Sequence, residues 1–262
     1  MSLSKRPPIA DSLKTRLRAR QSLTGAFVPA PSPEIVEIAA YAGYDFVVLD
    51  AEHGPLDLAD IRHMIRAAQA AGIPVLVRVP TASKDFIGRA LDSGADGILV
   101  PQVSSVEEAR QAVAQALYPP QGVRGAAFYA RTYEYTRQSG WDALDREQDE
   151  VVIGVMLETP QAIEQARAIS ETAGVDFVLL GAGDLSVALG RGDDSRSALT
   201  AAVAAIGALA RESKVPFGAS AVDPDTAAPY LRAGYQVIVV GLVPLLLRSA
   251  TQLCAGINQV RA

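Results

Sequence analysis

The stretch Phe46-Val-Val-Leu-Asp50-Ala-Glu52-His53-Gly-Pro55 joins an apolar run to two acids and a histidine. Two later stretches, Leu157-Glu158-Thr-Pro160 and Gly181-Ala-Gly183-Asp184-Leu-Ser186, likewise place an acid after a run of Val, Leu and Ile. Such runs are typical of parallel strands that are buried on both faces. Because the loops after parallel barrel strands converge on one rim, we expect these polar residues to form an active site there.

The rest of the chain repeats this alternation of short apolar runs with longer amphipathic segments, separated by Gly, Pro, Asp and Ser. The pattern predicts an α/β fold, a single (β/α)8 TIM barrel over residues 1–262, with a short leading helix at 11–21. The expected strands are 24–28, 46–50, 74–78, 97–101, 151–157, 177–180, 216–219 and 237–241, and helical patterns cover 33–42, 58–71, 105–117 and 161–170.

Composition narrows the class of protein. The net charge is -5 and no long basic cluster is present, which argues against a nucleic-acid surface. Cys254 is the only cysteine, so no intrachain disulfide can form and a reducing cytoplasm is the expected location. No apolar stretch reaches the length of a membrane span, and residues 1–20 lack the apolar core of a signal peptide. We therefore expect a cytoplasmic protein that binds neither nucleic acid nor membranes.

One segment, Tyr118 to Glu150, is much longer than an ordinary connection between a helix and a strand. Its aromatic and arginine residues favour a lid or a subunit contact, because these residue types are enriched together at interfaces. The alternative is a loop that packs its own small core. The residues concerned are Tyr118, Phe128, Tyr129, Tyr133, Tyr135 and Trp141, with Arg124, Arg131 and Arg137.

Two carboxylates suggest a metal site. With two histidines and one cysteine in the chain, zinc with its usual nitrogen and sulfur ligands is unfavourable. Glu158 and Asp184 end neighbouring strands, however, and would reach the same part of the rim. Oxygen ligands of this kind suit Mg²⁺ or Mn²⁺, with Co²⁺ as a substitute. The alternative is that each acid only caps the helix that follows it.

Arg78 and His53 are the candidates for charge stabilisation and proton transfer. Arg78 ends a strand, and because burying an unpaired guanidinium is costly it needs an anionic partner. A substrate carboxylate or an enolate is the preferred partner, and Asp50 or Glu52 the alternative. His53 lies on a tight turn beside two acids, which suits a general base.

Two further polar residues, Asp92 and His63, differ in whether the sequence suggests a functional role. Asp92 ends a helical segment, where the helix dipole disfavours a negative charge, and this hints at a role beyond stability, although local hydrogen bonds alone would also explain it. His63 is expected to be an ordinary exposed residue on the polar face of a helix.

The motifs, taken in order from Gly25 to about Gly241, resemble the HpcH/HpaI class II pyruvate aldolases. Single motifs are weak signals, but seven in register are strong. They are Asp50-Ala-Glu-His53-Gly-Pro, Val77-Arg78, Leu91-Asp92-Ser-Gly, Leu99-Val-Pro101, Tyr118-Pro-Pro-Gln-Gly-Val-Arg124-Gly125, Leu157-Glu158-Thr and Gly181-Ala-Gly-Asp184-Leu-Ser.

The resemblance implies metal-dependent, reversible aldol cleavage of a 4-hydroxy-2-oxo acid, of the 2-keto-3-deoxy type, to pyruvate and an aldehyde. Glu158 and Asp184 match the ligands of the divalent ion. Arg78 matches the arginine that stabilises the enolate, and His53 the proton acceptor, acting directly or through water on the metal.

The resemblance also assigns supporting roles. Asp92 matches the acid that raises the basicity of the histidine, and the backbone amide of Gly183 matches the group that holds the pyruvate carboxylate. Asp50 and Glu52 would support these groups. Met156 stands where relatives commonly have a substrate-binding glutamine, which suggests a less polar substrate.

Members of the family assemble as hexamers with exchanged terminal helices, so a homohexamer is expected, with the alternative that the apolar segment 244–257 closes its own barrel. Two other functions remain open: a lyase acting on a CoA thioester, of the citrate lyase beta or malyl-CoA type, and a barrel without catalysis. A Schiff-base aldolase is disfavoured, because Lys5, Lys14, Lys84 and Lys214 all lie outside the apolar strands.

Overall fold

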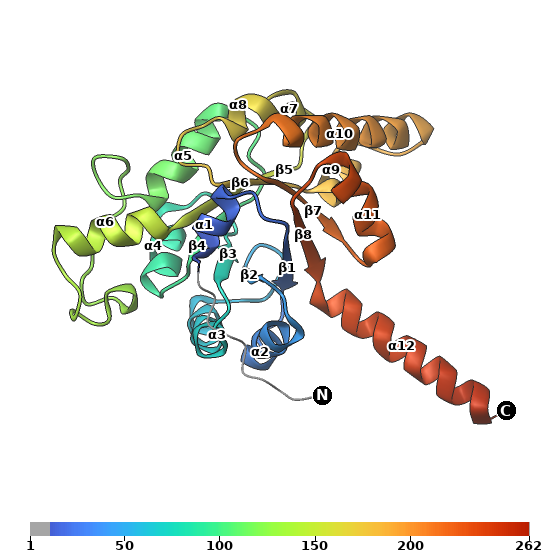
Figure 1. Cartoon of the computed structure of the whole chain (residues 1–262), viewed down its shortest axis with the longest axis horizontal. Helices are drawn as coiled ribbons and strands as arrows, with labels where there is room; N and C mark the ends of the chain where they lie inside the picture. Colours follow the sequence, from blue (N-terminus) through green and yellow to red (C-terminus); the bar gives the residue numbers. More distant parts are fainter. Residues whose placement is uncertain (1–10, 262) are drawn as a thin grey trace.

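The computed structural model describes residues 11–261, and its centre is a closed barrel of eight parallel strands in sequence order (Figure 1). Each strand pairs with the next, and β8 pairs with β1. The predicted (β/α)8 barrel is therefore confirmed. The strands are β1 (Leu23–Val28), β2 (Phe46–Asp50), β3 (Val75–Arg78), β4 (Gly97–Val100), β5 (Val152–Leu157), β6 (Phe177–Leu180), β7 (Phe217–Ala221) and β8 (Val237–Gly241).

Helices surround the barrel, and several begin and end with the expected capping residues. In α3, for example, Asp57 and Asp60 form a capping box, and Gly72 ends the helix in the left-handed conformation. The helices are α1 (Leu13–Arg18), α2 (Pro33–Ala42), α3 (Leu58–Ala71), α4 (Lys84–Asp92), α5 (Val106–Ala116), η1 (Arg131–Tyr133), α6 (Trp141–Glu150), α7 (Pro160–Glu164), α8 (Ala166–Ser170), α9 (Ala182–Leu189), α10 (Asp193–Glu212), α11 (Pro224–Ala233) and α12 (Leu242–Arg261).

Two helix predictions need correction. The leading helix is shorter than residues 11–21, and the segment 161–170 is divided into α7 and α8 at Gln165.

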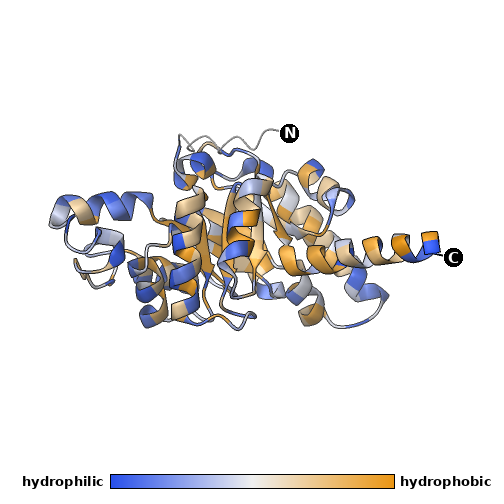
Figure 2. Cartoon of the chain, turned by 90° about the horizontal axis from the view of Figure 1, so that it is seen from below, coloured by the Kyte–Doolittle hydropathy of each residue, from blue (hydrophilic) through white to orange (hydrophobic). Residues whose placement is uncertain are grey.

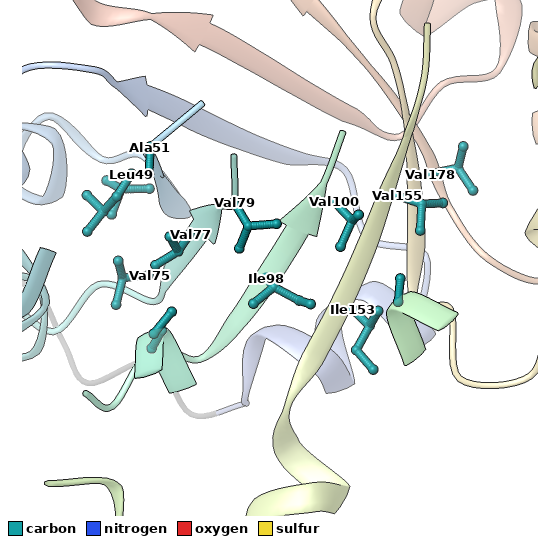
Figure 3. Packing of buried hydrophobic residues seen from close by; sticks show 14 of the residues in the cluster. Leu49, Ala51, Val75, Val77, Val79, Ile98, Val100, Ile153, Val155 and Val178 are labelled. Atoms are coloured by element: carbon teal, nitrogen blue, oxygen red, sulfur yellow. The ribbon is translucent and has the colours of Figure 1, made fainter. Parts of the chain in front are cut away.

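Side chains alternate between two buried layers. Val75, Val77, Ile98 and Ile153 face outward and pack under the helices (Figure 3). A second cluster fills the barrel itself with the alternate residues of the same strands, such as Leu76, and Leu13 and Leu17 of α1 belong to this cluster. The short α1 thus closes the N-terminal end of the barrel, and its opposite end is left for polar residues.

Acidic side chains secure that closed end. Asp45, Asp96 and Asp176 each precede an even-numbered strand, and a carboxylate oxygen of each accepts the amide of Thr24, Val75 or Ile153 on the strand before, at 2.8, 2.8 and 2.9 Å. Gln236 does the same for Phe217, at 3.0 Å. Helix α1 adds two ion pairs, Arg16 with Asp45 at 2.6 Å and Lys14 with Asp176 at 3.3 Å.

The long segment before β5 holds its own small core, as one of the two interpretations of the sequence expected. Phe128 packs against this cluster, its ring centroid lying 5.2 Å from that of Tyr133. The core consists of Tyr118, Tyr133, Ala143 and Leu144. Tyr129, Tyr135 and Trp141 are exposed, so the predicted role as a lid or interface rests on these three residues.

Helix α12 leaves the barrel instead of packing along it (Figure 1), and apolar residues run along its length (Figure 2). None of its residues is buried, and Leu246, Leu247 and Leu253 are 64%, 69% and 66% exposed. The alternative that this helix closes its own barrel is therefore wrong for the single chain. Among residues 11–261 no helix is both long and apolar enough to cross a membrane.

Candidate active site

Four strands deliver the predicted polar residues to the C-terminal rim of the barrel. Asp50 ends β2 and Arg78 ends β3, and the two are partners in the strand register. Glu158 follows β5, and Asp184 lies in the first turn of α9, which follows β6. The four strands are β2, β3, β5 and β6, and only β4 lies among them in the barrel. The charged residues therefore gather on one side of the rim.

Arg78 is the centre of this group and is only 9% exposed at its side chain. Its Nε and Nη2 donate to the two carboxylate oxygens of Asp50 at 2.8 and 2.6 Å, and its Nη1 lies 3.1 Å from Oε2 of Glu52. The ring of Phe27 covers the guanidinium, with 4.8 Å between Cζ and the ring centroid. Asp50 and Glu52, the alternative partners that the sequence offered for Arg78, are thus the side chains that contact it in the structure.

Asp50 also shapes the turn that carries His53. Its Oδ1 accepts the amides of Glu52 and His53 at 3.1 and 3.2 Å. Burial alone would raise the pKa of this carboxyl, but the Arg78 guanidinium and the two amides outweigh burial and lower it. A Cβ at Gly54 would lie 2.3 Å from the carbonyl oxygen of Asp50, so this tight turn requires glycine.

Glu158 is a buried carboxylate with one oxygen left without a partner. Its Oε2 accepts the amide of Gln102 at 2.6 Å, whereas Oε1 is buried and has no hydrogen bond. Burial, together with the charges of Glu52 and Asp184, raises the pKa of Glu158 to about 7, although the amide of Gln102 and the charge of Arg78 act to lower it. Thr159 caps helix α7, so the alternative that Glu158 is only a helix cap is wrong.

The residues at this position fit a hard divalent cation. Residues 11–261 contain no group of three or more histidine, cysteine or acidic side chains that could hold a metal, so the chain supplies fewer protein ligands than a closed structural site needs. Glu158 and Asp184 offer oxygen ligands, and Oε1 of Glu158 needs a positive partner. A Cβ at Gly181 would lie 2.7 Å from that oxygen, so glycine leaves the room around it.

His53 and Asp92 are not brought together within the chain. His53 is 58% exposed at its side chain, and its Nε2 lies 3.8 Å from Oε2 of Glu52. Asp92 ends α4 and accepts instead from Nη2 of the buried Arg124 at 2.8 Å. The assignment of Asp92 as the acid that raises the basicity of His53 therefore stays a prediction. His63 is exposed, as expected.

Two contributors were missed in the sequence. Phe27, at the C-terminal end of β1, covers Arg78, and the amide of Gln102 holds Glu158. The place of Phe27 at the end of a predicted strand was a usable signal, whereas a backbone amide leaves none. Met156 points into the barrel as expected, with its sulfur 4.0 Å from Nη1 of Arg78.

The part of the chain that carries the rim is similar to a known protein family. Residues 23–250 match the family model of the HpcH/HpaI aldolase/citrate lyase family. The chain belongs to this family. Because the match extends from β1 into α12, every candidate residue of the rim lies within the part that the HpcH/HpaI family shares.

Similar HpcH/HpaI proteins cover almost the whole chain. A hydroxypyruvate/pyruvate aldolase of Cupriavidus necator is 32% identical over 96% of this chain and 94% of its own length. A 5-keto-4-deoxy-D-glucarate aldolase of Klebsiella pneumoniae is 34% identical, over 92% and 94%. The crystal structure of a family member from Burkholderia cenocepacia has a TM-score of 0.88 at 32% identity and covers 95% of this chain and 99% of its own.

Proposed function

We propose that the protein is a class II aldolase that cleaves a 4-hydroxy-2-oxo acid of the 2-keto-3-deoxy type reversibly to pyruvate and an aldehyde. The observation that carries the proposal is the buried Glu158, whose free oxygen lies on the same side of one rim as Asp184 and the guanidinium of Arg78. This combination can hold a cation and a negatively charged reacting group side by side. The names of the two aldolase relatives support the same reaction class.

In this proposal Glu158 and Asp184 hold a divalent ion, Mg²⁺ or Mn²⁺ with Co²⁺ as a substitute. When bound, the ion polarises the keto group of the substrate and lowers the energy of the enolate. The amide of Gly183, which lies in the first turn of α9, would hold the substrate carboxylate. Met156 would line the pocket beside the keto acid.

The chain supplies the remaining steps. His53, which is accessible at the rim, takes the proton of the 4-hydroxyl group as the carbon–carbon bond breaks and the aldehyde leaves. Arg78 lies against the negative charge that develops on the three-carbon fragment, while Asp50 holds the guanidinium in place. Protonation of the enolate carbon then gives pyruvate.

The two alternatives are less well supported. A CoA-thioester lyase of the citrate lyase beta or malyl-CoA type would share the carboxylates but needs a basic surface for the CoA phosphates, and the sequence shows no basic cluster for it. A barrel without catalysis would have no use for a buried carboxylate held without a partner.

The direct test is to incubate the purified protein with a panel of 4-hydroxy-2-oxo acids and to measure pyruvate release with and without EDTA. We expect release from at least one compound, loss with EDTA, and recovery when Mg²⁺ or Mn²⁺ is restored. Release that is insensitive to EDTA would contradict the metal-dependent reaction, and no release from any member would contradict the aldolase.

We further propose that the protein is a homo-oligomer, a hexamer, in which α12 packs on another copy. A hollow of about 470 Å³ lies between β1, β8, α11 and the first turns of α12, and Leu23, Leu231 and Ile238 contribute to its lining. The exposed apolar residues of α12 suit such a hollow. Light scattering should give the mass of a hexamer for the native chain and a lower mass for Leu246→Glu with Leu253→Glu. A monomeric native chain would contradict the assembly.

A cytoplasmic location, with neither nucleic acid nor membrane as a partner, completes the proposal. It rests on the single, exposed Cys254 and on the acidic composition.

A further inference from the structure

Gln102 follows β4, the strand that lies among the four strands of the candidate site without adding a side chain to it. The amide of Gln102 donates to Oε2 of Glu158 at 2.6 Å. The next amide, that of Val103, donates to the carbonyl oxygen of Met156 at 3.1 Å. The segment after β4 therefore runs beside both Met156 and a proposed metal ligand.

The backbone of Gln102 has a conformation that is uncommon for this residue type. Its φ is 55°, in the left-handed region, which glycine adopts without a steric cost. Residues held there against their preference are concentrated at functional sites, so the outlier is a reason to look for a role. The conformation supports the amide bond to Glu158, but glycine would supply the same amide at a lower cost. The amide alone therefore does not explain a glutamine at this position.

The side chain of Gln102 is free to contact a ligand. It is exposed, and within residues 11–261 Gln102 makes hydrogen bonds only through its backbone. Because an N–Cα bond is about 1.5 Å long, the side chain begins within about 4 Å of Oε2 of Glu158. A carboxamide brings two N–H donors and a carbonyl acceptor to this place.

Met156, which lies beside this segment on β5, cannot replace the carboxamide. Its thioether has no hydrogen to donate, and its sulfur lies 4.0 Å from Nη1 of Arg78. β4 and β5 are paired in register up to Val100 and Val155, so the residues that follow them lie on neighbouring strand ends. The segment after β4 thus offers the polar group that β5 lacks.

We propose that Gln102 is a substrate-binding residue, whose carboxamide donates a hydrogen bond to an oxygen of the keto acid beside Glu158. The inference rests on the function proposed above, and it concerns the three-carbon part of the substrate. The oxygens of this part are a carboxylate and a keto group that becomes negatively charged in the enolate. A hydrogen bond to a charged group typically changes affinity by about 10–100-fold.

The test removes the carboxamide and keeps the backbone. In Gln102→Gly the left-handed conformation and the amide that holds Glu158 are retained. Pyruvate binding to the full chain with Mn²⁺ is measured by calorimetry, and Mn²⁺ binding by electron paramagnetic resonance. We expect pyruvate binding to weaken by about 10–100-fold while Mn²⁺ affinity stays at its native value. Thr136→Gly, at an exposed residue with a φ of 80° before α6, is the matched control and should bind both as the native chain does.

A second substitution tests whether the carboxamide itself is what matters. Adding Met156→Gln to Gln102→Gly supplies a carboxamide from β5 and should restore part of the pyruvate affinity, whereas adding Met156→Leu should not. Circular dichroism of each variant checks that it is folded.

Three outcomes would contradict the proposal in different ways. Unchanged pyruvate affinity in Gln102→Gly would overturn the role of Gln102 while the proposed function stands. An equal loss of Mn²⁺ affinity in this variant would also overturn it, because the defect would then lie at the metal. A native chain that binds neither Mn²⁺ nor pyruvate would contradict the proposed function itself.

Discussion

Both ends of the barrel carry acidic side chains, but the hydrogen bonds that these side chains make differ between the two ends. At the N-terminal end Asp45 and Asp176 accept a strand amide and pair with Arg16 and Lys14 of α1. At the C-terminal end the side chains of Glu52 and Glu158 are buried, yet each keeps an oxygen without a hydrogen bond. The difference between the two ends lies in whether the protein itself satisfies the carboxylate oxygens.

This difference distinguishes acids that stabilise the fold from acids that could bind a ligand. A buried carboxylate that the chain satisfies stabilises the fold, whereas one that the chain leaves unsatisfied costs free energy unless a ligand completes it. Burial of an acid is therefore a poor guide to a site by itself. Mutations at the two ends should accordingly affect different measurements.

The largest effect is expected from removing the proposed metal ligands at the C-terminal end. Glu158→Ala or Asp184→Ala should reduce pyruvate release to the rate measured with EDTA, because a carboxylate that would hold the ion is lost. Glu164→Ala, at an exposed position on α7, should behave as the native chain. Thermal melting should show that the variants fold. Normal turnover after metal is removed and restored would break the assignment.

The next largest effect is expected for the exposed histidine of the rim. His53→Ala should slow aldol cleavage by roughly 10²–10⁴-fold, which is the usual contribution of a general base. Pyruvate binding, measured by calorimetry, should change much less. His63→Ala removes an exposed histidine away from the rim and serves as the control. If cleavage by His53→Ala stays normal, another group accepts the proton.

At the N-terminal end the expected effect is on stability. Asp176→Ala leaves Lys14 buried without its acid and should lower the free energy of unfolding by about 3–5 kcal/mol, while kcat/KM stays near its native value. Arg167→Ala breaks an ion pair whose side chains are 58% and 66% exposed and should change the free energy of unfolding far less, because solvent screens such a pair. Denaturant unfolding and kinetics on the same samples test both. A large loss of activity in folded Asp176→Ala would remove the distinction between the ends.

The smallest effect is expected for Met156, which lies between the inner core and the rim. Met156→Gln adds a donor and an acceptor at nearly constant volume and should raise kcat/KM for polyhydroxylated sugar acids relative to less polar 4-hydroxy-2-oxo acids. Met156→Leu, which adds no polar group, should leave the ratio near its native value. An unchanged ratio in Met156→Gln would mean that the side chain lies outside the substrate pocket.

The fold was largely predictable from the sequence, because buried parallel strands leave continuous apolar runs. The predicted run 46–50 is β2 without change, and 74–78 differs from β3 by one residue. The path of α12 was not predictable, since an apolar helix pattern does not say on which surface the helix packs. The division of 161–170 was also missed, because the break at Gln165 has no proline or glycine to mark it.

The position of the candidate residues at one rim was predictable from the sequence, but their contacts were not. Position at strand ends identified Arg78 and Glu158, yet the sequence favoured a substrate as the partner of Arg78, and the chain provides Asp50 instead. The sequence also did not predict that Asp92 accepts from Arg124, because Arg124 lies in the long segment before β5. Pairing depends on the three-dimensional approach of elements, which local patterns do not contain.

The four side chains that secure the N-terminal end also divide the barrel into repeats. Each of them joins one odd-numbered strand to the next strand: Asp45 joins β1 to β2, Asp96 joins β3 to β4, Asp176 joins β5 to β6, and Gln236 joins β7 to β8. At its N-terminal end the barrel therefore consists of four (βα)₂ units. The connection between β4 and β5 falls between two such units and carries the exposed turn around Tyr135. Half-barrels divided in this turn keep every one of these bonds within a fragment, whereas a cut between β5 and β6 separates Asp176 from Ile153. Fragments of the first kind should therefore reassemble at lower concentration, which can be followed by recovery of activity on mixing.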